Sequence, residues 1–218
     1  MTSQKKFILF DFDGVISNSF DIALKTAQTL CVHMTEEEYR SAFRGNIYET
    51  HHKMMPDTHG PECQHDRNWF EVYIPMFEEG ATPFSGIEEV IQKLSHEHVL
   101  IIVSSSEHSP IQGFLEKYHL GRYFSEIMGN EVHKHKAEKI RMIFEKYNIV
   151  AKDCVFITDT LGDMNEASEK GVGSIGVTWG WHSRETLEQG KPFRIVDTPQ
   201  EINPAISDYF AGKPSVSD

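Results

Sequence analysis

The stretch Phe10-Asp11-Phe12-Asp13-Gly14-Val15 closes a short apolar segment that begins at Phe7. Two carboxylates stand one residue apart directly after the apolar residues, and a glycine that lets the backbone turn sharply follows them. These charges repel each other unless a cation lies between them or one carboxyl stays protonated. The stretch is therefore interpreted as a strand that ends in a charged site, and the alternative is a simple turn with a capping aspartate.

A second acidic pair ends another apolar run, in the stretch CVFITDTLGD at 154–163. Its carboxylates, Asp159 and Asp163, are four residues apart. In a doubly wound sheet the two strands can be neighbours, and functional groups gather at the carboxyl ends of such strands. We therefore expect Asp159 and Asp163 to converge with Asp11 and Asp13. Clustered oxygen ligands of this kind favour Mg²⁺ over zinc, which prefers His and Cys.

The rest of the chain alternates apolar runs with helical patterns. The apolar runs are continuous, as in strands that are buried on both faces, and the helical patterns place their apolar residues on one side. This alternation predicts an α/β fold with a doubly wound parallel sheet. The predicted strands are Phe7–Phe12, Val99–Val103, Cys154–Ile157, Gly173–Trp179 and a weaker Arg194–Val196, and the clearest helices are Gly86–Leu94 and Lys136–Tyr147.

The segment from Asn18 to Pro83 has a different pattern, with no convincing strand. It predicts short helices around Ile22–Leu30, Glu36–Phe43 and Trp69–Phe77, with a loop over Pro56–Asp66. We therefore expect an α/β core formed by residues 1–17 and 84–218, with a small all-helical cap domain inserted at 18–83. The insert is either a surface elaboration or a lid over the strand ends.

Composition restricts the possible partners of the 218-residue chain. With 33 acidic and 21 basic residues the formal net charge is −12, which makes nucleic acid an unsuitable partner. No apolar run is long enough to span a membrane, and the N-terminus lacks the pattern of a signal peptide. The widely spaced Cys31, Cys63 and Cys154 predict neither a disulfide framework nor a CxxC metal site. A cytoplasmic monomer or homodimer is expected.

Two further features lie between the acidic pairs. The predicted strand Val99–Val103 ends in Ser104-Ser105-Ser106, whose hydroxyl and backbone N–H groups can bind phosphate oxygens. The stretch Val132-His-Lys134-His-Lys136 precedes a predicted helix, where a lysine can neutralise an anion. Polar residues also end many ordinary strands, and a basic loop can simply be solvated.

Taken in this order, these residues resemble the haloacid dehalogenase superfamily, and within it the phosphatases of the phosphoglycolate phosphatase type. The first motif of that family, DxDGxhxxS, matches Asp11 through Ser19, and the second matches Ser104. The third is a lysine entering a helix, which Lys136 matches best, although the usual following proline is absent and Lys134 is a rival. The fourth matches Asp159 and Asp163.

The resemblance implies a phosphatase that acts on a small phosphorylated metabolite through an aspartyl-phosphate intermediate. It implies Asp11 as the nucleophile and Asp13 as the general acid and base. The remaining implied roles are Mg²⁺ binding by Asp11, the backbone carbonyl of Asp13 and Asp159, phosphate binding by Ser104, Ser105 and Lys136, and support from Asp163.

Two alternatives stay open. A phosphomutase of the β-phosphoglucomutase type uses the same four motifs, and a catalytically silent binding protein can share the fold. The carboxyl group at Asp13 favours phosphate monoesters, since their leaving alkoxide needs a proton. In the insert, Arg44 lies where a cap loop can reach the substrate, although the segment offers no decisive chemistry.

Overall fold

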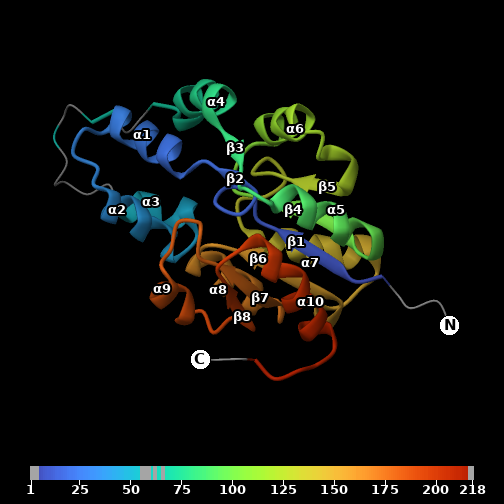
Figure 1. The fold of residues 1–218 in the computed structure, drawn as a ribbon. Coiled ribbons are helices and arrows are strands. Elements are labelled where there is room, and N and C mark those ends of the chain that lie inside the picture. The colour runs from blue at the N-terminus through green and yellow to red at the C-terminus, as the bar shows by residue number, and fades with distance from the viewer. Residues whose placement is uncertain (1–4, 55–59, 61–62, 65–66, 216–218) are drawn as a thin grey trace.

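A six-stranded parallel sheet forms the centre of the computed structural model, which describes residues 5–54, 60, 63–64 and 67–215 (Figure 1). The strand order is β5-β4-β1-β6-β7-β8, and every neighbouring pair is parallel. This order confirms the predicted doubly wound α/β class. The strands are β1 (Phe7–Phe10), β4 (Val99–Val103), β5 (Phe124–Met128), β6 (Cys154–Thr158), β7 (Gly173–Val177) and β8 (Arg194–Val196).

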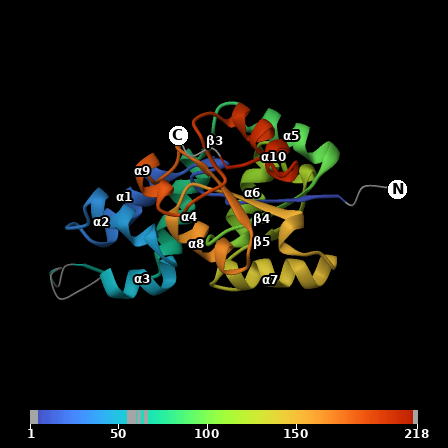
Figure 2. The ribbon, with the colours of Figure 1, turned by 90° about the horizontal axis from the view of Figure 1, so that it is seen from below.

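Alternate residues of the central strands pack against different helix layers. In β1, Ile8 and Phe10 belong to the apolar cluster on one face of the sheet, whereas Phe7 and Leu9 belong to the cluster on the other. Because both faces are buried, the strand reads as a continuous apolar run. Figure 2 shows α5 (Ile87–Glu97) and α10 (Ile202–Phe210) on one side of the sheet and α7 (Lys136–Tyr147) on the other.

The remaining core helices connect these strands. They are α6 (His108–Lys117), α8 (Leu161–Glu169) and α9 (Arg184–Glu188). The apolar cluster beside α5 and α10 also contains Ile111, Phe114 and Leu115 from α6. Ala167 of α8 joins the opposite cluster, together with Ile140 and Ile143 of α7. The helices on both faces therefore hold the carboxyl ends of the strands at one common edge.

The predicted insert is helical in the structure. Its helices are α1 (Phe20–Leu30), α2 (Glu36–Ser41), the 3₁₀ helix η1 (Ala42–Arg44), α3 (Ile47–Met54) and α4 (Trp69–Gly80). They lie together to one side of the sheet, beyond the ends of β1 and β4 (Figure 1). The division of the chain into a core and a cap at residues 18 and 83 stays a prediction. The loop predicted over Pro56–Asp66 lies largely outside the described residues.

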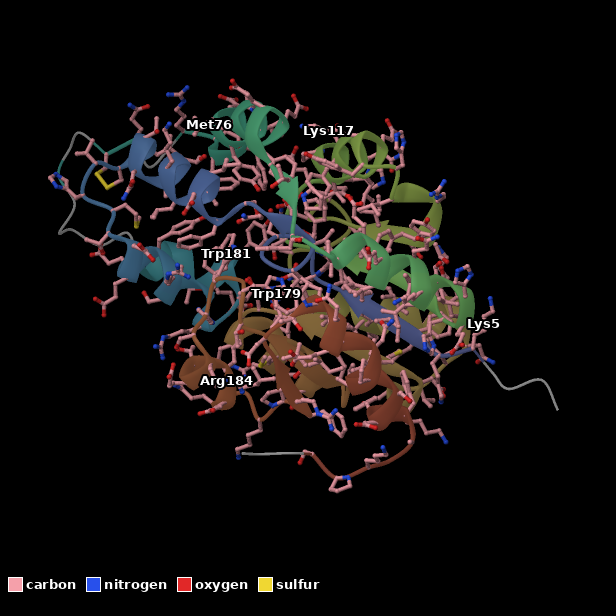
Figure 3. All side chains as sticks on the ribbon, in the orientation of Figure 1. Lys5, Met76, Lys117, Trp179, Trp181 and Arg184 are labelled. Carbon is pink, nitrogen blue, oxygen red and sulfur yellow. A yellow bond between two sulfur atoms is a disulfide. The ribbon has the colours of Figure 1, made fainter. Side chains whose placement is uncertain are left out.

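Two expectations about the insert are wrong. The first was that it contains no strand, whereas β2 (Ser17–Asn18) pairs antiparallel with β3 (Thr82–Pro83) where the insert leaves and rejoins the core. The second was that the cysteines form no disulfide, whereas Cys31 and Cys63 are bonded across 32 residues of sequence (Figure 3). Sequence spacing could not reveal this pair, because the end of α1 approaches residue 63 only in the folded chain.

Other differences from the sequence prediction concern one edge strand and the ends of two inner strands. The strand β5 was missed because it is an edge strand in which polar residues interrupt the apolar ones, so its pattern lacks the continuous apolar character of β1. The predicted strands over Phe7–Phe12 and Gly173–Trp179 end two residues earlier, at Phe10 and Val177. Within the described part of the chain, no helix combines the length and the apolar character that crossing a membrane requires.

Candidate active site

Asp11 directly follows β1 at the carboxyl edge of the sheet. Its backbone N–H continues the pairing with β6 by donating to the carbonyl of Ile157 at 2.9 Å. The side chain is buried, and its Oδ1 accepts a hydrogen bond from the backbone N–H of Phe12 at 2.7 Å. The other oxygen, Oδ2, lies 2.8 Å from the ammonium nitrogen of Lys136. One carboxylate oxygen is therefore fixed by the backbone and the other by a buried cation.

Asp13 is held by hydroxyl groups from three separate parts of the chain. Its Oδ1 accepts from Ser19 Oγ at 2.7 Å and from Tyr73 OH at 2.8 Å, and its Oδ2 accepts from Ser106 Oγ. Tyr73 belongs to α4 of the insert, and Ser106 follows β4 of the core. Burial, followed by the charge of Asp13, raises the pKa of Tyr73 well above its usual value, so the phenol stays protonated and donates. Asp13 thus joins the insert to the sheet.

The serine run after β4 lies beside these carboxylates. Ser104 is buried, and its Oγ accepts from the backbone N–H of Ser106 at 3.0 Å. The carbonyl of Ser105 accepts from Tyr48 OH in α3 at 2.6 Å. All three serines line the same cavity as Asp11 and Asp13. The structure therefore places Ser104 and Ser105, both predicted from the sequence, next to the acidic pair.

Lys136 begins α7 and bridges two carboxylates. Its Nζ lies 2.8 Å from Asp11 Oδ2 and 2.8 Å from Asp163 Oδ2, and the side chain is buried. Burial lowers the pKa of Lys136, but Asp11 and Asp163 outweigh it and raise the pKa above the usual lysine value. Lys136 is therefore charged. The rival lysine, Lys134, is exposed and lies over the ring of Tyr48 at 4.6 Å.

Asp163 lies in the first turn of α8, where it accepts from two donors. Its Oδ2 accepts from Lys136 Nζ at 2.8 Å and from Thr158 Oγ1 at 2.9 Å. Burial raises the pKa of Asp163, but Lys136 and the hydrogen bonds outweigh it and lower the pKa to about 2. Asp163 is thus an ionised partner of Lys136. Thr158 orients that partner through its hydroxyl group.

Asp159 follows β6 and is fully buried. Its Oδ2 accepts from the backbone N–H of Trp181 at 2.8 Å, while its Oδ1 has no hydrogen-bond partner among the described residues. The carboxyl group is enclosed by backbone, because a Cβ added at Gly14 would lie 2.0 Å from Oδ2 and one at Gly180 would lie 2.3 Å from it. Gly14 also has a φ of +78°, which glycine adopts without strain.

Among the described residues, the three buried carboxylates of Asp11, Asp159 and Asp163 outnumber the one lysine that forms an ion pair with any of them. Burial raises the pKa of Asp11 well above its usual value, Lys136 opposes this rise, and Asp163 adds to it. Burial also raises the pKa of Asp159 to about 7, against the effect of the Trp181 N–H and with a further increase from Asp163. The site therefore binds either protons or an additional cation, and the bare oxygen of Asp159 is available to such a cation.

A cavity of about 240 Å³ opens above these residues and extends between the core and the insert. Its floor includes Asp11, Asp13, Lys136 and Asp163, whereas aromatic and aliphatic side chains of the insert form most of its walls. Arg44, predicted as a substrate contact, is not among the lining residues, whereas its neighbour Gly45 is. In Figure 3, Trp181 lies between the insert and the core.

Several residues of the site have no counterpart in the sequence prediction. Glu166 is buried in α8 and accepts from Asn46 Nδ2 at 2.8 Å and from the backbone N–H of Ala137 at 3.0 Å. It thereby connects the insert to the start of the lysine-bearing helix. Tyr73, a partner of Asp13, was also missed, whereas Ser106 was anticipated as part of the serine run that can bind phosphate oxygens and not as a partner of Asp13. No local pattern indicated either contact, since the two residues lie 60 and 93 positions from Asp13 in sequence.

Known proteins resemble this chain in both sequence and fold. The family model described as "Haloacid dehalogenase-like hydrolase" matches residues 8–177. A phosphoglycolate phosphatase from Pectobacterium atrosepticum is 26% identical over 148 residues, which cover 66% of this chain and 63% of that protein. A 5′-nucleotidase from Pseudomonas aeruginosa is 30% identical over 113 residues, which cover 50% of this chain and 51% of that protein. The matches thus span less than two thirds of either relative.

Solved structures share the fold over almost the whole chain. A hydrolase from Pseudomonas syringae superposes with a TM-score of 0.79 at 16% identity, covering 94% of this chain and 99% of that one. A predicted phosphatase from Clostridium acetobutylicum gives a TM-score of 0.75 at 21% identity, covering 94% and 100%. These similarities establish the fold. The chemistry of the site has to be inferred from its own residues.

Proposed function

Because this chain belongs to the haloacid dehalogenase-like hydrolases, we propose that it is a Mg²⁺-dependent phosphatase of small phosphate monoesters. The observation that carries the proposal is the placement of Asp11. Its carboxylate lies at the floor of a cavity that it shares with Asp13, and it is oriented at 2.8 Å by Lys136. A nucleophile, a proton donor and a cation thus face one enclosed space.

In the proposed reaction, a carboxylate oxygen of Asp11 attacks phosphorus while the ester P–O bond breaks. The departing alkoxide takes the proton of the Asp13 carboxyl group and leaves as the alcohol. Asp13, now ionised, removes a proton from water as the water oxygen attacks the aspartyl-phosphate. This step releases inorganic phosphate, regenerates Asp11 and returns the proton to Asp13. Two displacements thus replace one difficult hydrolysis.

The position of Asp13 supports its proposed role as the general acid. Three hydroxyl groups hold its carboxyl group in place, and they link the end of β1 to the end of β4 and to α4. Such fixation is what proton transfer in a transition state requires, since a general acid must lie within hydrogen-bond reach of the leaving oxygen. The hydroxyls can rotate, so they accommodate both protonation states.

Lys136, Ser104 and Ser105 are the proposed ligands of the transferring phosphoryl oxygens. Lys136 carries a fixed positive charge on the floor of the cavity, and Asp163 holds it there. Cations and N–H or O–H donors of this kind stabilise phosphoryl transfer chiefly by electrostatics and positioning. We assign Asp163 a positioning role through Lys136.

The residues present fit a magnesium ion. Asp159 offers a buried oxygen that has no hydrogen-bond partner among the described residues, and Asp11 is buried as well. No three His, Cys, Asp or Glu side chains of the described residues form a metal-binding group by themselves. The proposed set therefore consists of Asp11, Asp159 and the backbone carbonyl of Asp13, completed by water, as Mg²⁺ commonly requires. The ion would supply charge neutralisation between the nucleophile and the phosphoryl group.

The insert is proposed to act as a cap over this site, with a hinge at the β2–β3 pair. Both chain crossings lie close to the end of β1, so a small rotation there would open or close the cavity. Paired labels on α4 and α5 should move closer together when Mg²⁺ and fluoroberyllate, a phosphoryl mimic, are added. Unchanged distances in a complex that is shown to be saturated would make the insert a fixed wall.

Hydrolysis of p-nitrophenyl phosphate tests the proposed function. We expect turnover that requires Mg²⁺, stops with EDTA and disappears in Asp11→Asn, whose circular dichroism spectrum should match that of the original chain. Undiminished turnover in excess EDTA would refute the metal requirement. Absence of turnover with Mg²⁺ would favour the silent binding protein, and phosphoryl transfer to a sugar phosphate instead of to water would favour the phosphomutase.

The proposed partner is a small phosphorylated metabolite, and the proposed location is the cytoplasm. The surface supports the exclusion of nucleic acid, since the formal net charge is −12. A monomer or a homodimer is proposed as the assembly. Sedimentation equilibrium at micromolar concentration would distinguish the two states.

A further inference from the structure

The cavity changes character with distance from Asp11. At its floor lie the carboxylates, the serines and Lys136, whereas the space inside the insert is enclosed by apolar and aromatic groups. These groups come from separate helices of the insert, from the loop between α1 and α2, and from the core loop after β7. They include Leu30, Met34, Ile47, Trp69, Phe70 and Trp181. A polar floor below an apolar chamber suits a molecule with one charged end and one apolar end.

Tyr73 connects the two zones of the cavity. Its hydroxyl donates to Asp13 Oδ1 at 2.8 Å, and its ring stacks on Trp69 with centroids 4.2 Å apart and an interplanar angle of 23°. Asp13 is the proposed donor to the leaving oxygen, so the carbon atoms attached to that oxygen begin beside Tyr73. The leaving group is therefore directed towards the aromatic wall that Tyr73 and Trp69 form.

The charges of the lining residues disfavour a leaving group with a second anionic group. Two cationic side chains of the described residues line the cavity, Lys136 and Arg67. Lys136 is already bound by Asp11 and Asp163, and Arg67 is exposed and donates to Gln64 at 3.2 Å. A carboxylate in the apolar chamber would lose its hydration without gaining a buried cation, which is costly.

The volume of the cavity limits the size of the leaving group. At about 240 Å³ the cavity exceeds the roughly 150 Å³ of an apolar protein cavity that accommodates benzene, and the phosphoryl group takes part of the difference. The chamber therefore has room for about one ring.

From these observations we infer that the substrates are phosphate monoesters of alcohols that carry one apolar or aromatic ring. This inference rests on the proposed phosphatase activity and adds the chemical class of the leaving group. It assigns leaving-group recognition to the aromatic wall of the insert and excludes small esters with a second anionic group, such as 2-phosphoglycolate, as preferred substrates.

Benzyl phosphate and 2-phosphoglycolate test the inference, because both are esters of poor alkoxide leaving groups. They differ mainly in the group that would enter the apolar chamber, which is a phenyl ring in the first and a carboxylate in the second. We expect kcat/KM to be about 10- to 100-fold higher for benzyl phosphate, the range that burial of one ring provides. A preference for 2-phosphoglycolate would overturn the inference. A preference for thymidine 5′-monophosphate over benzyl phosphate would overturn the one-ring size limit.

Variants locate the preference within the wall. Trp69→Ala should reduce the benzyl-to-glycolate ratio of kcat/KM by about tenfold, and Trp69→Phe should retain most of it. Val32→Ala is the matched control, since Val32 is an apolar residue of the same insert and its side chain is 69% exposed. An unchanged ratio in folded Trp69→Ala would refute the assignment of the wall.

Binding of non-hydrolysable phosphonates separates this inference from the proposed function. Benzylphosphonate should bind at least tenfold more tightly than phosphonoacetate in calorimetry with Mg²⁺ present. If this difference appears and no ester is hydrolysed, the chamber assignment stands and the phosphatase proposal fails. If esters are hydrolysed and the two phosphonates bind equally, the phosphatase proposal stands and the chamber assignment fails.

Discussion

Replacing Asp13 by asparagine should remove proton donation while preserving the shape of the site. The amide oxygen can keep the hydrogen bonds from Ser19 and Tyr73, and the amide nitrogen can donate to Ser106 Oγ, whose hydroxyl rotates. A hydrogen bond to a charged acceptor is worth roughly 1 kcal/mol more than one to a neutral acceptor. With three such bonds, Asp13→Asn should lower the unfolding free energy by at most about 3 kcal/mol. The loss should be smaller still, because the substitution also removes a half-buried charge.

The effect on turnover should depend on the leaving group. General acid catalysis contributes about 10²- to 10⁴-fold to rates, so Asp13→Asn should lower kcat/KM for benzyl phosphate by that factor. Nitrophenolate leaves without needing a proton. The rate of phosphoryl transfer from p-nitrophenyl phosphate to the enzyme should therefore fall by no more than about tenfold, and stopped-flow absorbance measures this rate. Both esters react with the same nucleophile beside the same cation, so a difference between their rate losses reports on the leaving group alone.

Steady-state rates with both esters, together with urea unfolding, provide the measurements. Asp21→Asn is the matched control, because Asp21 is an exposed carboxylate in the first turn of α1. It should change neither rate by more than about twofold. Equal losses for benzyl and nitrophenyl phosphate in the Asp13→Asn phosphoryl-transfer step would refute the general-acid assignment, and a loss of folding beyond the limit above would refute the hydrogen-bond argument.

Three further predictions follow from the charges and the disulfide. Burial, followed by the charge of Lys136, lowers the pKa of Lys139 to about 7 from 10.5, so the unfolded chain binds more protons above pH 7. Between pH 7 and pH 9, the unfolding free energy of the original chain should therefore rise by about 2 kcal/mol more than that of Lys139→Met. Urea unfolding at each pH measures both free energies, and an equal rise in the two proteins would contradict the prediction. Lys93→Met, at an exposed lysine, is the control. Because burial raises the pKa of Asp159 to about 7, protons compete with Mg²⁺ for this carboxylate at lower pH. The Mg²⁺ affinity measured by calorimetry should therefore fall by up to tenfold per pH unit below pH 7. A Mg²⁺ affinity that does not depend on pH would count against Asp159 as a ligand. Replacing both Cys31 and Cys63 by serine opens a 32-residue separation and should cost about 3–4 kcal/mol of unfolding free energy, whereas an unchanged urea midpoint would argue against the bond.

The central part of the fold could be predicted because burial on both faces leaves a direct trace in sequence. The strands β1, β4 and β6 are continuous apolar runs, and each was expected close to its observed position. The strand β5 has a mixed pattern because one of its sides has no neighbouring strand. Sequence periodicity thus identifies the centre of the sheet better than its edges.

The acidic residues of the site could also be anticipated, because parallel strands bring their carboxyl ends to one edge. What holds those residues could not. Asp159 is oriented by the backbone N–H of Trp181, which every residue type except proline supplies, and Asp13 is oriented by a tyrosine 60 residues away. Contacts of this kind depend on how the insert folds back over the sheet, and no local pattern encodes them.

In the proposed mechanism, the same contact from Tyr73 links specificity to catalysis. Its ring is stacked on Trp69 in the chamber wall, and its hydroxyl positions the proposed acid, so a leaving group that presses on the wall also acts on Asp13. A well-fitting ring should therefore favour the geometry in which the proton reaches the leaving oxygen. In that case the wall contributes to kcat as well as to KM, because part of the energy of binding the ring is used to align Asp13 with the leaving oxygen. If the wall only binds the ring, its loss would change KM alone, and the separate kcat and KM values of Trp69→Ala with benzyl phosphate distinguish the two situations.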